Sequence, residues 1–226
     1  PMGALRDYIS KDPVTEKYSV LNFPVLPENP YSIDLQETAN LLDRFDPELI
    51  ILGKSMILHR EPVAEIRKML ETKTSKPVIM YDMAHVLGLI GPHFQNPYAE
   101  GADIITGSTH KTFYGSQRGV IGAAYEDGTP EFELWKAIER RVFPGAVSNH
   151  HLGTLLGLLM AAIEMNAFKD SYQPQVIANA KAFAKALEDE GLEVQGDPKV
   201  GYTETHQVVV VVGYAQGCAV AQELEE

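Results

Sequence analysis

A lysine that follows an apolar run and a cluster of hydroxyl side chains is the residue of this sequence best placed for covalent chemistry. The run is Ala102–Ile105, and Ser108, Thr109 and His110 directly precede Lys111. The run predicts a short buried strand that ends at Gly107. A lysine amine condenses with an aldehyde only when it is neutral, so a site that uses it must lower its pKa.

Three interpretations of Lys111 compete. A lysine in a loop is most often simply solvated. A Walker-type phosphate loop needs a glycine directly before the lysine, where this chain has His110, so we reject it. The third interpretation is a lysine that binds pyridoxal 5′-phosphate covalently. It requires an acid at a neighbouring strand end, which keeps the pyridine nitrogen protonated.

Asp82 meets that requirement. It ends the apolar run 77–82, and apolar residues continue from it to Ile90. An aspartate often only caps the next element. A carboxylate within an apolar segment, however, needs a cationic partner or several donors, and a pyridinium nitrogen is such a cation. His85, three residues further on, is placed to contact the cofactor ring or its phenolic oxygen.

These two motifs together resemble the serine hydroxymethyltransferase family. Tyr81–His85 and Ser108–Thr112 carry the likeness, and Phe143–Gly145 and Gly53–Ser55 resemble two further segments of that family. The similarity extends over nearly the whole chain. It implies the aspartate aminotransferase fold, which is fold type I of the pyridoxal-phosphate-dependent transferases.

The chain departs from the family pattern at two turns. Phe113–Gly119 replaces a Pro-Arg-Gly-Gly turn after the lysine, and Ala146–His151 replaces a turn that meets the cofactor phosphate of a partner subunit. Together with Thr203–Val208, these variants resemble the threonine transaldolases, which are relatives of the hydroxymethyltransferases.

The resemblance implies roles for individual residues. Lys111 is expected to hold the cofactor until the substrate amine displaces it, with His110 and Asp82 as the other catalytic residues. Ser148 and Asn149 are expected to contact the cofactor of the partner in a homodimer with shared active sites. The full set of expected cofactor-binding residues is Lys111, Asp82, His85, Ser108, Ser55, Thr109, Arg118, Ser148 and Asn149. Ser55 also follows a predicted strand at the carboxyl edge, where open α/β sheets bind ligands.

The implied reaction is cleavage or formation of the Cα–Cβ bond of a β-hydroxy amino acid. In a hydroxymethyltransferase the one-carbon unit passes to tetrahydrofolate, whereas in a threonine transaldolase the glycyl carbon attacks another aldehyde without folate. A third alternative is an inactive member of the fold that serves as an interaction subunit. Retention of Asp82, His85 and Lys111 favours an enzyme.

The composition of the chain argues against several other classes of function. The formal net charge of −12 argues against binding to nucleic acid or to anionic membranes. The single cysteine, Cys218, excludes an internal disulfide, which suits a cytoplasmic protein. The apolar stretch 152–165 is too short to span a bilayer and predicts a buried helix. His150 and His151 lack neighbouring ligands, so we predict no metal site.

The remaining pattern predicts an α/β fold with a mostly parallel sheet and covering helices. We expect a cofactor-binding large domain over residues 1–172, and a linking helix with the start of a small α+β domain over residues 173–226. The predicted strands are 18–25, 48–53, 77–82, 102–105, 119–125, 192–196 and 206–212. The predicted helices are 33–45, 61–74, 131–142, 152–168, 173–191 and 219–226.

Measured against the resembled family, the first quarter and a shorter C-terminal part are expected to lie outside this chain. Those parts carry the phosphate loop, the ring-stacking histidine, the catalytic glutamate and the arginine that binds the substrate carboxylate. We therefore expect the 226-residue chain by itself to lack full turnover.

Overall fold

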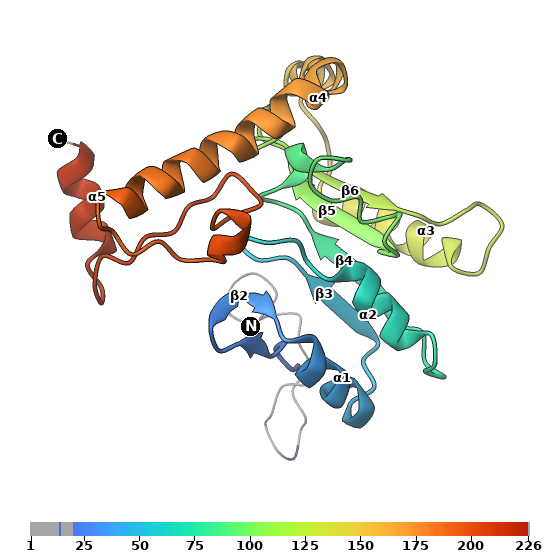
Figure 1. The fold of residues 1–226 in the computed structure, drawn as a ribbon. Coiled ribbons are helices and arrows are strands. Elements are labelled where there is room, and N and C mark those ends of the chain that lie inside the picture. Colours follow the sequence, from blue (N-terminus) through green and yellow to red (C-terminus); the bar gives the residue numbers. More distant parts are fainter. Residues whose placement is uncertain (1–13, 15–19, 226) are drawn as a thin grey trace.

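The computed structural model describes residue 14 and residues 20–225, and a four-stranded sheet lies at its centre (Figure 1). The strands follow one another across the sheet as β3 (Leu49–Leu52), β4 (Val78–Asp82), β5 (Ile104–Ser108) and β6 (Gly119–Ala123). The pairs β3–β4 and β4–β5 are parallel, and β6 is antiparallel to β5. The mostly parallel α/β sheet expected from the sequence is confirmed.

Helices and one small hairpin surround this sheet. The hairpin pairs β1 (Val25–Leu26) with β2 (Asn29–Ile33). The helices are α1 (Leu35–Arg44), α2 (Val63–Leu70), α3 (Phe132–Arg140), the π-helical η3 (Arg141–Ala146), α4 (Leu152–Asp189) and α5 (Gly217–Glu225), with short 3-10 turns η2 (Leu87–Leu89) and η4 (Pro198–Val200). Asp34 begins α1 because its side chain accepts a hydrogen bond from the Glu37 amide.

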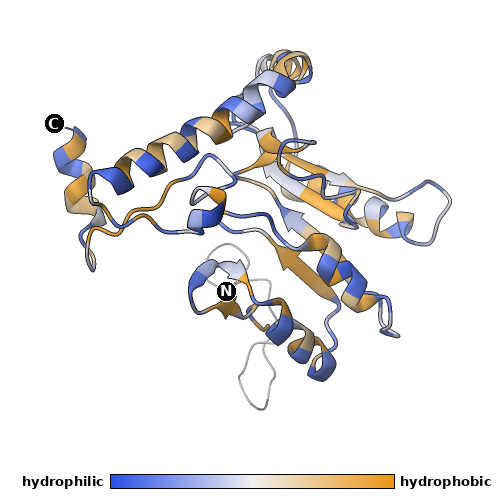
Figure 2. Cartoon of the chain, viewed as in Figure 1, coloured by the Kyte–Doolittle hydropathy of each residue, from blue (hydrophilic) through white to orange (hydrophobic). Residues whose placement is uncertain are grey.

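The core lies between the sheet and the apolar faces of α1 and α2. Val63, Ile66 and Leu70 are spaced on one side of α2 and are buried against strand residues such as Ile50 and Ile79. Figure 2 shows the corresponding pattern, with apolar colour on the central strands and both colours on α2. This packing fixes where strands β3 and β4 end.

Strand β5 does not end at Gly107 as the sequence analysis expected. The strand continues to Ser108, because Gly107 pairs with Val120 of β6. A Cβ atom at Gly107 would lie 2.7 Å from Cδ1 of Leu87. The glycine therefore allows the Leu87 turn to pack closely on the strand, a reason for glycine inside a strand other than breaking it.

Helix α4 differs most from expectation. The sequence predicts two helices, but one helix runs from Leu152 to Asp189 and continues through Pro174. The predicted burial of residues 152–168 is wrong, since only Ala161 and Met165 of that span are buried, while Leu156 is 62% exposed. The predicted end of this helix at Gly191 agrees with the structure. The amides of Gly191 and Leu192 donate to the carbonyls of Glu188 and Leu187, which closes the last turn.

Among the described residues, α4 is the helix whose length and hydropathy would allow it to cross a bilayer. The apolar stretch 152–165 is thus part of a helix longer than the sequence analysis allowed for. Length and hydropathy by themselves are weak evidence for a span, because a helix of a soluble protein can meet the same criterion.

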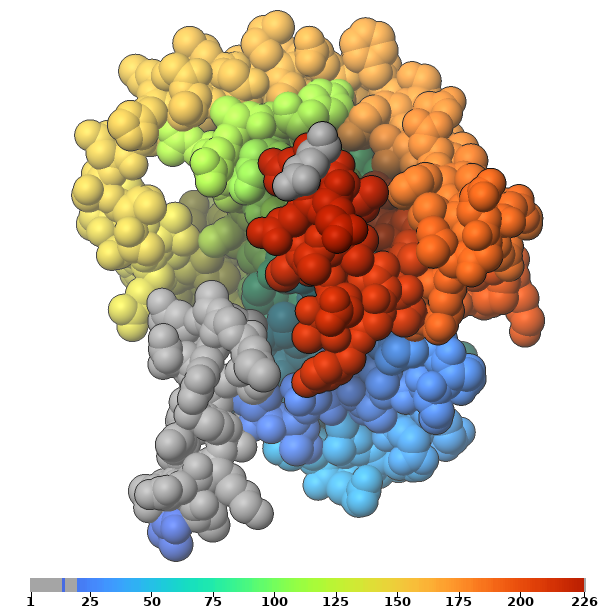
Figure 3. All heavy atoms as spheres, turned by 90° about the vertical axis from the view of Figure 1, so that its left-hand side faces the viewer, coloured from blue at the N-terminus to red at the C-terminus, as the bar shows by residue number. Residues whose placement is uncertain are grey.

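Three predicted strands are smaller than expected. Residues 18 and 19 of the predicted strand 18–25 lie outside the described part, and of the remaining residues only Val25 belongs to a strand, β1. Pro24, directly before it, has no amide to donate. The segments 192–196 and 206–212 meet at one bridge, Val194 to Val210. Figure 3 shows the C-terminal region, in red, lying between α4 and the N-terminal elements.

The close approach of β3 and β4 at Gly53 gives a test of this arrangement. Gly53 has φ +100°, and a Cβ there would lie 2.1 Å from the Asp82 carbonyl oxygen. We expect Gly53→Ala to lower the free energy of unfolding by about 3 kcal/mol or more. The matched control is Gly128→Ala, which also has positive φ (+87°) but open space around it, with an expected loss of about 1 kcal/mol. Equal losses in urea unfolding of the two variants would contradict the close approach.

Candidate active site

The carboxyl ends of β4 and β5 bring the two residues singled out by the sequence to one edge of the sheet. Asp82 ends β4 and pairs in register with Thr106 of the parallel strand β5. Strand β5 ends at Ser108, and Lys111 follows three residues later. Parallel strands place their carboxyl ends at the same edge, so the acid and the lysine lie at neighbouring positions there.

The side chain of Asp82 is exposed, although it lies within an apolar run of the sequence. Its neighbours Tyr81 and Met83 are both fully buried. Since side chains alternate along a strand, Asp82 faces away from the core. The expectation that this carboxylate lies in apolar surroundings is therefore wrong. Its Oδ1 accepts a hydrogen bond from the Ala84 amide at 3.0 Å.

Lys111 contacts His85 directly. Its Nζ lies 3.1 Å from Nε2 of His85. An ammonium group only donates hydrogen bonds, so Nε2 of His85 accepts and the imidazole is neutral, with its proton on Nδ1. Partial burial and the positive charge of Lys111 lower the pKa of His85, and the carboxylate of Asp82 opposes them. His85 is thus a neutral base against the lysine amine.

Thr112 joins the turn that carries His85 to the loop that carries Lys111. Its buried hydroxyl donates to the His85 carbonyl and accepts from the Gly88 amide, both at 3.0 Å. Gly88 must be a glycine here, because a Cβ would lie 2.1 Å from the Thr112 carbonyl oxygen. The distance between Lys111 and His85 therefore depends on this contact.

Helix α4 supports the same two segments from outside. The hydroxyl of Tyr172 donates to the Thr112 carbonyl at 2.8 Å. The next residue, Gln173, is 1% exposed, and its Nε2 donates to the carbonyls of Gly88 and Ile90. Adjacent residues of one helix thus hold both the lysine loop and the turn after His85.

The other predicted site residues on the lysine segment are placed differently. Ser108 is half-buried at the strand end, and His110 is exposed. Thr109 is 2% exposed, and its hydroxyl donates to the carbonyls of Ser116 and Arg118. The hydroxyl of Thr109 is therefore engaged with the backbone of the segment that leads into β6.

The predicted phosphate residues lie towards the start of α4. Arg118 donates to the His151 carbonyl at 2.9 Å and also bonds the Thr154 hydroxyl. Ser148 and Asn149 are exposed in the segment that precedes the helix. In the described part of the chain, neither a hydrogen bond nor an ion pair joins Arg118, Ser148 or Asn149 to Lys111.

A C-terminal strap, which we define as Thr203–Gln207, lies in a segment that the sequence analysis named for its family likeness, but its contacts with the segment after β3 were not anticipated. Ser55 follows β3, and its carbonyl accepts from Nε2 of Gln207 at 2.8 Å. Oε1 of Gln207 accepts from the Ile57 amide at 2.6 Å, and the hydroxyl of Thr205 donates to the Ile57 carbonyl at 2.7 Å. The strap thereby reaches the carboxyl edge of the sheet. Its polar residues before a valine run were the available signal.

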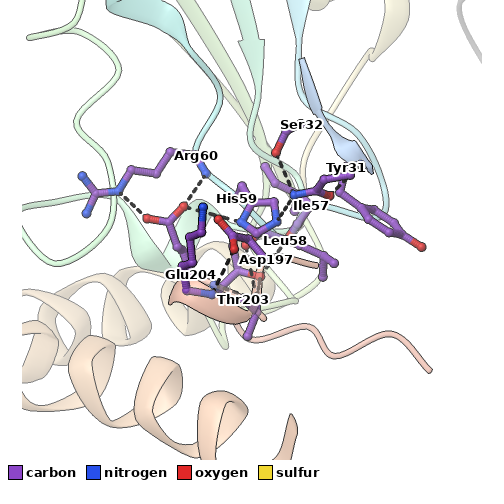
Figure 4. A network of polar contacts seen from close by, with 12 residues as sticks. Tyr31, Ser32, Ile57, Leu58, His59, Arg60, Asp197, Thr203 and Glu204 are labelled. Atoms are coloured by element: carbon purple, nitrogen blue, oxygen red, sulfur yellow. Dashed lines mark hydrogen bonds and ion pairs between the residues drawn. The ribbon is translucent and has the colours of Figure 1, made fainter. Parts of the chain in front are cut away.

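Glu204 of the strap extends this connection to the N-terminal hairpin (Figure 4). Its carboxylate lies 3.7 Å from Nδ1 of the buried His59 and accepts from the Arg60 amide at 3.3 Å. On the other side of the same imidazole, Asn29 lies 3.0 Å from Nε2. The contact with His59 holds the pKa of Glu204 below its usual range.

The donor set at this edge fits pyridoxal phosphate. Within the part of the chain that the structure describes, no ion pair involves either Asp82 or Lys111, although Lys54 and Lys73 both have carboxylate partners. A carboxylate without a cation suits a protonated pyridine nitrogen, and a lysine beside a neutral base suits an aldehyde. Among the same residues no cluster of histidine, cysteine and carboxylate side chains could hold a metal ion.

Comparisons with known proteins agree with these features. The family model described as serine hydroxymethyltransferase matches residues 6–219. A serine hydroxymethyltransferase of Archaeoglobus fulgidus is 48% identical over 208 residues, which are 91% of this chain and 45% of that protein. One from Staphylothermus marinus is 42% identical over 198 residues, 87% of this chain and 43% of that protein. The chain therefore spans less than half the length of these relatives.

A solved structure gives the same result for the fold. The crystal structure of L-threonine transaldolase from Pseudomonas fluorescens in the internal aldimine state superposes with a TM-score of 0.75 and 37% identity. The match covers 86% of this chain and 42% of that one. It confirms the expected fold, the type I fold of pyridoxal-phosphate-dependent transferases, of which this chain is a part.

The lowered pKa of His85 predicts how stability depends on pH. Below about pH 6.5 the unfolded chain binds a proton at His85 that the folded chain resists, so stability falls as the pH falls through this window. We expect His85→Gln to flatten this part of the curve in urea unfolding measured from pH 7 downwards. His93→Gln, at an exposed contact with Asp170, controls for the loss of a histidine as such. An unchanged slope in His85→Gln would contradict the desolvated, neutral imidazole.

Proposed function

The chain belongs to the serine hydroxymethyltransferase family, and from that premise we propose that it carries the lysine site of a pyridoxal-phosphate-dependent enzyme acting on β-hydroxy amino acids. The observation that carries the proposal is the pair of groups at the ends of β4 and β5. Asp82 and Lys111 are accessible, oppositely charged and engaged in no ion pair within the described residues. The basic ring nitrogen of pyridoxal phosphate matches the carboxylate of Asp82, and its aldehyde matches the amine of Lys111.

Each residue has a chemical task in this proposal. When bound, pyridoxal phosphate supplies the ring that takes up electrons from a broken Cα–Cβ bond. Lys111 provides the amine that holds the cofactor aldehyde, and Nε2 of His85, 3.1 Å away, accepts the proton that the ammonium must lose. Asp82 keeps a proton on the pyridine nitrogen by its negative charge.

Two acceptors of the cleaved carbon unit are supported by different observations. The matching family model and curated relatives are named serine hydroxymethyltransferases, which favours tetrahydrofolate with serine and glycine. The solved structure is named an L-threonine transaldolase, which favours a second aldehyde and no folate. We place hydroxymethyl transfer first because the family model covers most of the chain.

The assembly proposed is a homodimer in the cytoplasm with shared active sites. Support comes from exposed apolar side chains on η3, on α4 and on the segment between them. They are Phe143, Val147, Leu152, Leu155, Leu156, Leu159, Met160 and Ile163. If a second copy covers this surface, Ser148 and Asn149 of one copy would lie close to the cofactor of the other copy. A domain boundary near Gln173 remains part of this proposal, although α4 is continuous there.

Lys111 should be the lysine that bonds the cofactor. After incubation with pyridoxal phosphate and reduction with borohydride, which makes the bond permanent, peptide mass spectrometry is expected to find the label on the Lys111 peptide. Lys111→Arg should lose this label, while Lys136→Arg, at an exposed pair with Glu133, should retain it. Absence of label on a chain shown to be folded by circular dichroism would support the inactive interaction subunit instead.

An assay with the longest form of the protein that can be expressed determines which molecule accepts the cleaved carbon unit. We expect cleavage of serine that is stimulated by tetrahydrofolate and abolished by Lys111→Arg. Release of acetaldehyde from threonine without folate, accelerated by an acceptor aldehyde, would replace hydroxymethyl transfer with transaldolase activity.

A further inference from the structure

The loop that carries Lys111 contains a tyrosine in a backbone conformation that favours glycine. Tyr114 has φ +49°, which lies in the left-handed region. A residue with a side chain is strained in this region, and a bulky residue there is an outlier. Tyr114 therefore keeps this conformation only because other contacts hold it. Strain of this kind is concentrated at functional sites, so the contacts of Tyr114 are of interest.

The backbone of Tyr114 holds the backbone of the lysine. Its amide donates to the Lys111 carbonyl at 3.0 Å, which closes a four-residue turn over 111–114, called the lysine turn below. Glycine is favoured at the last position of the commonest type of turn, yet here that position is a tyrosine. The next amide, that of Gly115, donates to the Thr109 carbonyl at 2.6 Å. The chain is thus fixed on both sides of Lys111.

The ring of Tyr114 packs against helix α4. It meets the ring of Tyr172 edge to face, with the ring centroids 5.0 Å apart and an angle of 86° between the planes. This is a favourable geometry for two aromatic rings. The hydroxyl of Tyr172 also donates to the Thr112 carbonyl at 2.8 Å. One residue of α4 therefore contacts both the middle and the end of the lysine turn. A glycine in place of Tyr114 would be unstrained but would lose the ring contact.

We propose that Tyr114 is a positioning residue of the lysine site, whose ring, held by Tyr172, keeps the lysine turn closed and Nζ of Lys111 against Nε2 of His85. This inference rests on the proposed role of Lys111. The side chain of Lys111 is exposed, and its contact with His85, at 3.1 Å, is the hydrogen bond that its amine makes among the described residues. A long flexible side chain keeps such a contact only if its backbone is fixed.

The two phenols differ in what they contribute. The hydroxyl of Tyr114 makes no hydrogen bond within the described part of the chain, so its ring alone provides the contact with α4. The hydroxyl of Tyr172 must keep its proton in order to donate to the Thr112 carbonyl. Partial burial and the neighbouring Tyr114 raise the pKa of Tyr172, so that proton is present at pH 7. Phenylalanine should therefore replace Tyr114 without opening the lysine turn.

The test compares two substitutions of Tyr114. Tyr114→Gly removes both the strain and the ring, whereas Tyr114→Phe keeps both. The probe is pyridoxal phosphate, and borohydride reduction makes the bond to lysine permanent. We expect Tyr114→Gly to label Lys111 about tenfold more slowly at pH 7, because a small misplacement of a reacting group costs one to two orders of magnitude in rate. Tyr114→Phe should stay within about twofold of the unmodified chain, since the aromatic contact remains.

Stability separates positioning from a purely structural role. Loss of strain and loss of the ring contact oppose each other in Tyr114→Gly, so its midpoint in urea unfolding should change little. The matched control is Tyr202→Gly, because Tyr202 also has positive φ (+69°) and contacts α4, through Glu188. The control should label Lys111 at the rate of the unmodified chain. An unchanged labelling rate in Tyr114→Gly, an equal loss in Tyr202→Gly, or a joint loss of labelling and stability in Tyr114→Gly would overturn the proposal.

Imidazole NMR titration of the cofactor-free chain distinguishes failure of this proposal from failure of the proposed function. Partial burial and the positive charge of Lys111 lower the pKa of His85. If the lysine turn opens, Nζ moves away and its charge acts less on the imidazole. The pKa of His85 should therefore rise in Tyr114→Gly and stay unchanged in Tyr114→Phe. An unchanged pKa of His85 in Tyr114→Gly would overturn the proposal whether or not Lys111 is labelled. Absence of label from the unmodified chain, with the expected rise in the pKa of His85, would contradict the proposed function and support the positioning role of Tyr114.

Discussion

The parallel pairing of β4 with β5 is the constraint on which the site depends. The register that sets Asp82 beside Thr106 determines that the acid and the lysine three residues beyond β5 emerge at one edge. A shift by one residue would turn Asp82 into the core and Tyr81 out of it. The buried side chains of Tyr81 and Met83, on either side of Asp82, make that shift costly. Core packing and the geometry of the site are therefore set by the same residues.

Two distant parts of the chain then fix what the strands leave free. Helix α4 reaches the lysine loop through Tyr172 and the turn after His85 through Gln173. The strap reaches the segment after β3 through Thr205 and Gln207. Loops at a sheet edge are otherwise mobile, so these buried hydrogen bonds supply the rigidity that a catalytic pair needs. The lysine site is local in sequence, but its support is not.

The sequence was informative where the signal is local. Apolar runs predict β3, β4 and β6 within one or two residues, and the motifs at Asp82 and Lys111 identify the family that the comparisons confirm. Gly107 was misread because its partner is the Leu87 side chain, which no local pattern reveals. The exposure of α4 was missed for a related reason, since an apolar helix has the same sequence whether a core or another surface covers it.

Two residues to which the sequence analysis assigned no role share one property. Thr112 and Gln173 act through contacts with Gly88, which lies 24 positions from Thr112 and 85 positions from Gln173. Polar residues of this kind look like ordinary surface residues until the fold buries them.

A crystal structure of the chain grown with pyridoxal phosphate tests the central claim most directly. The account predicts continuous electron density from Nζ of Lys111 to the cofactor, with the pyridine nitrogen against the carboxylate of Asp82. Cofactor bonded to another lysine, or bound to Lys111 with its nitrogen away from Asp82, would contradict the assignment of this edge of the sheet as the active site.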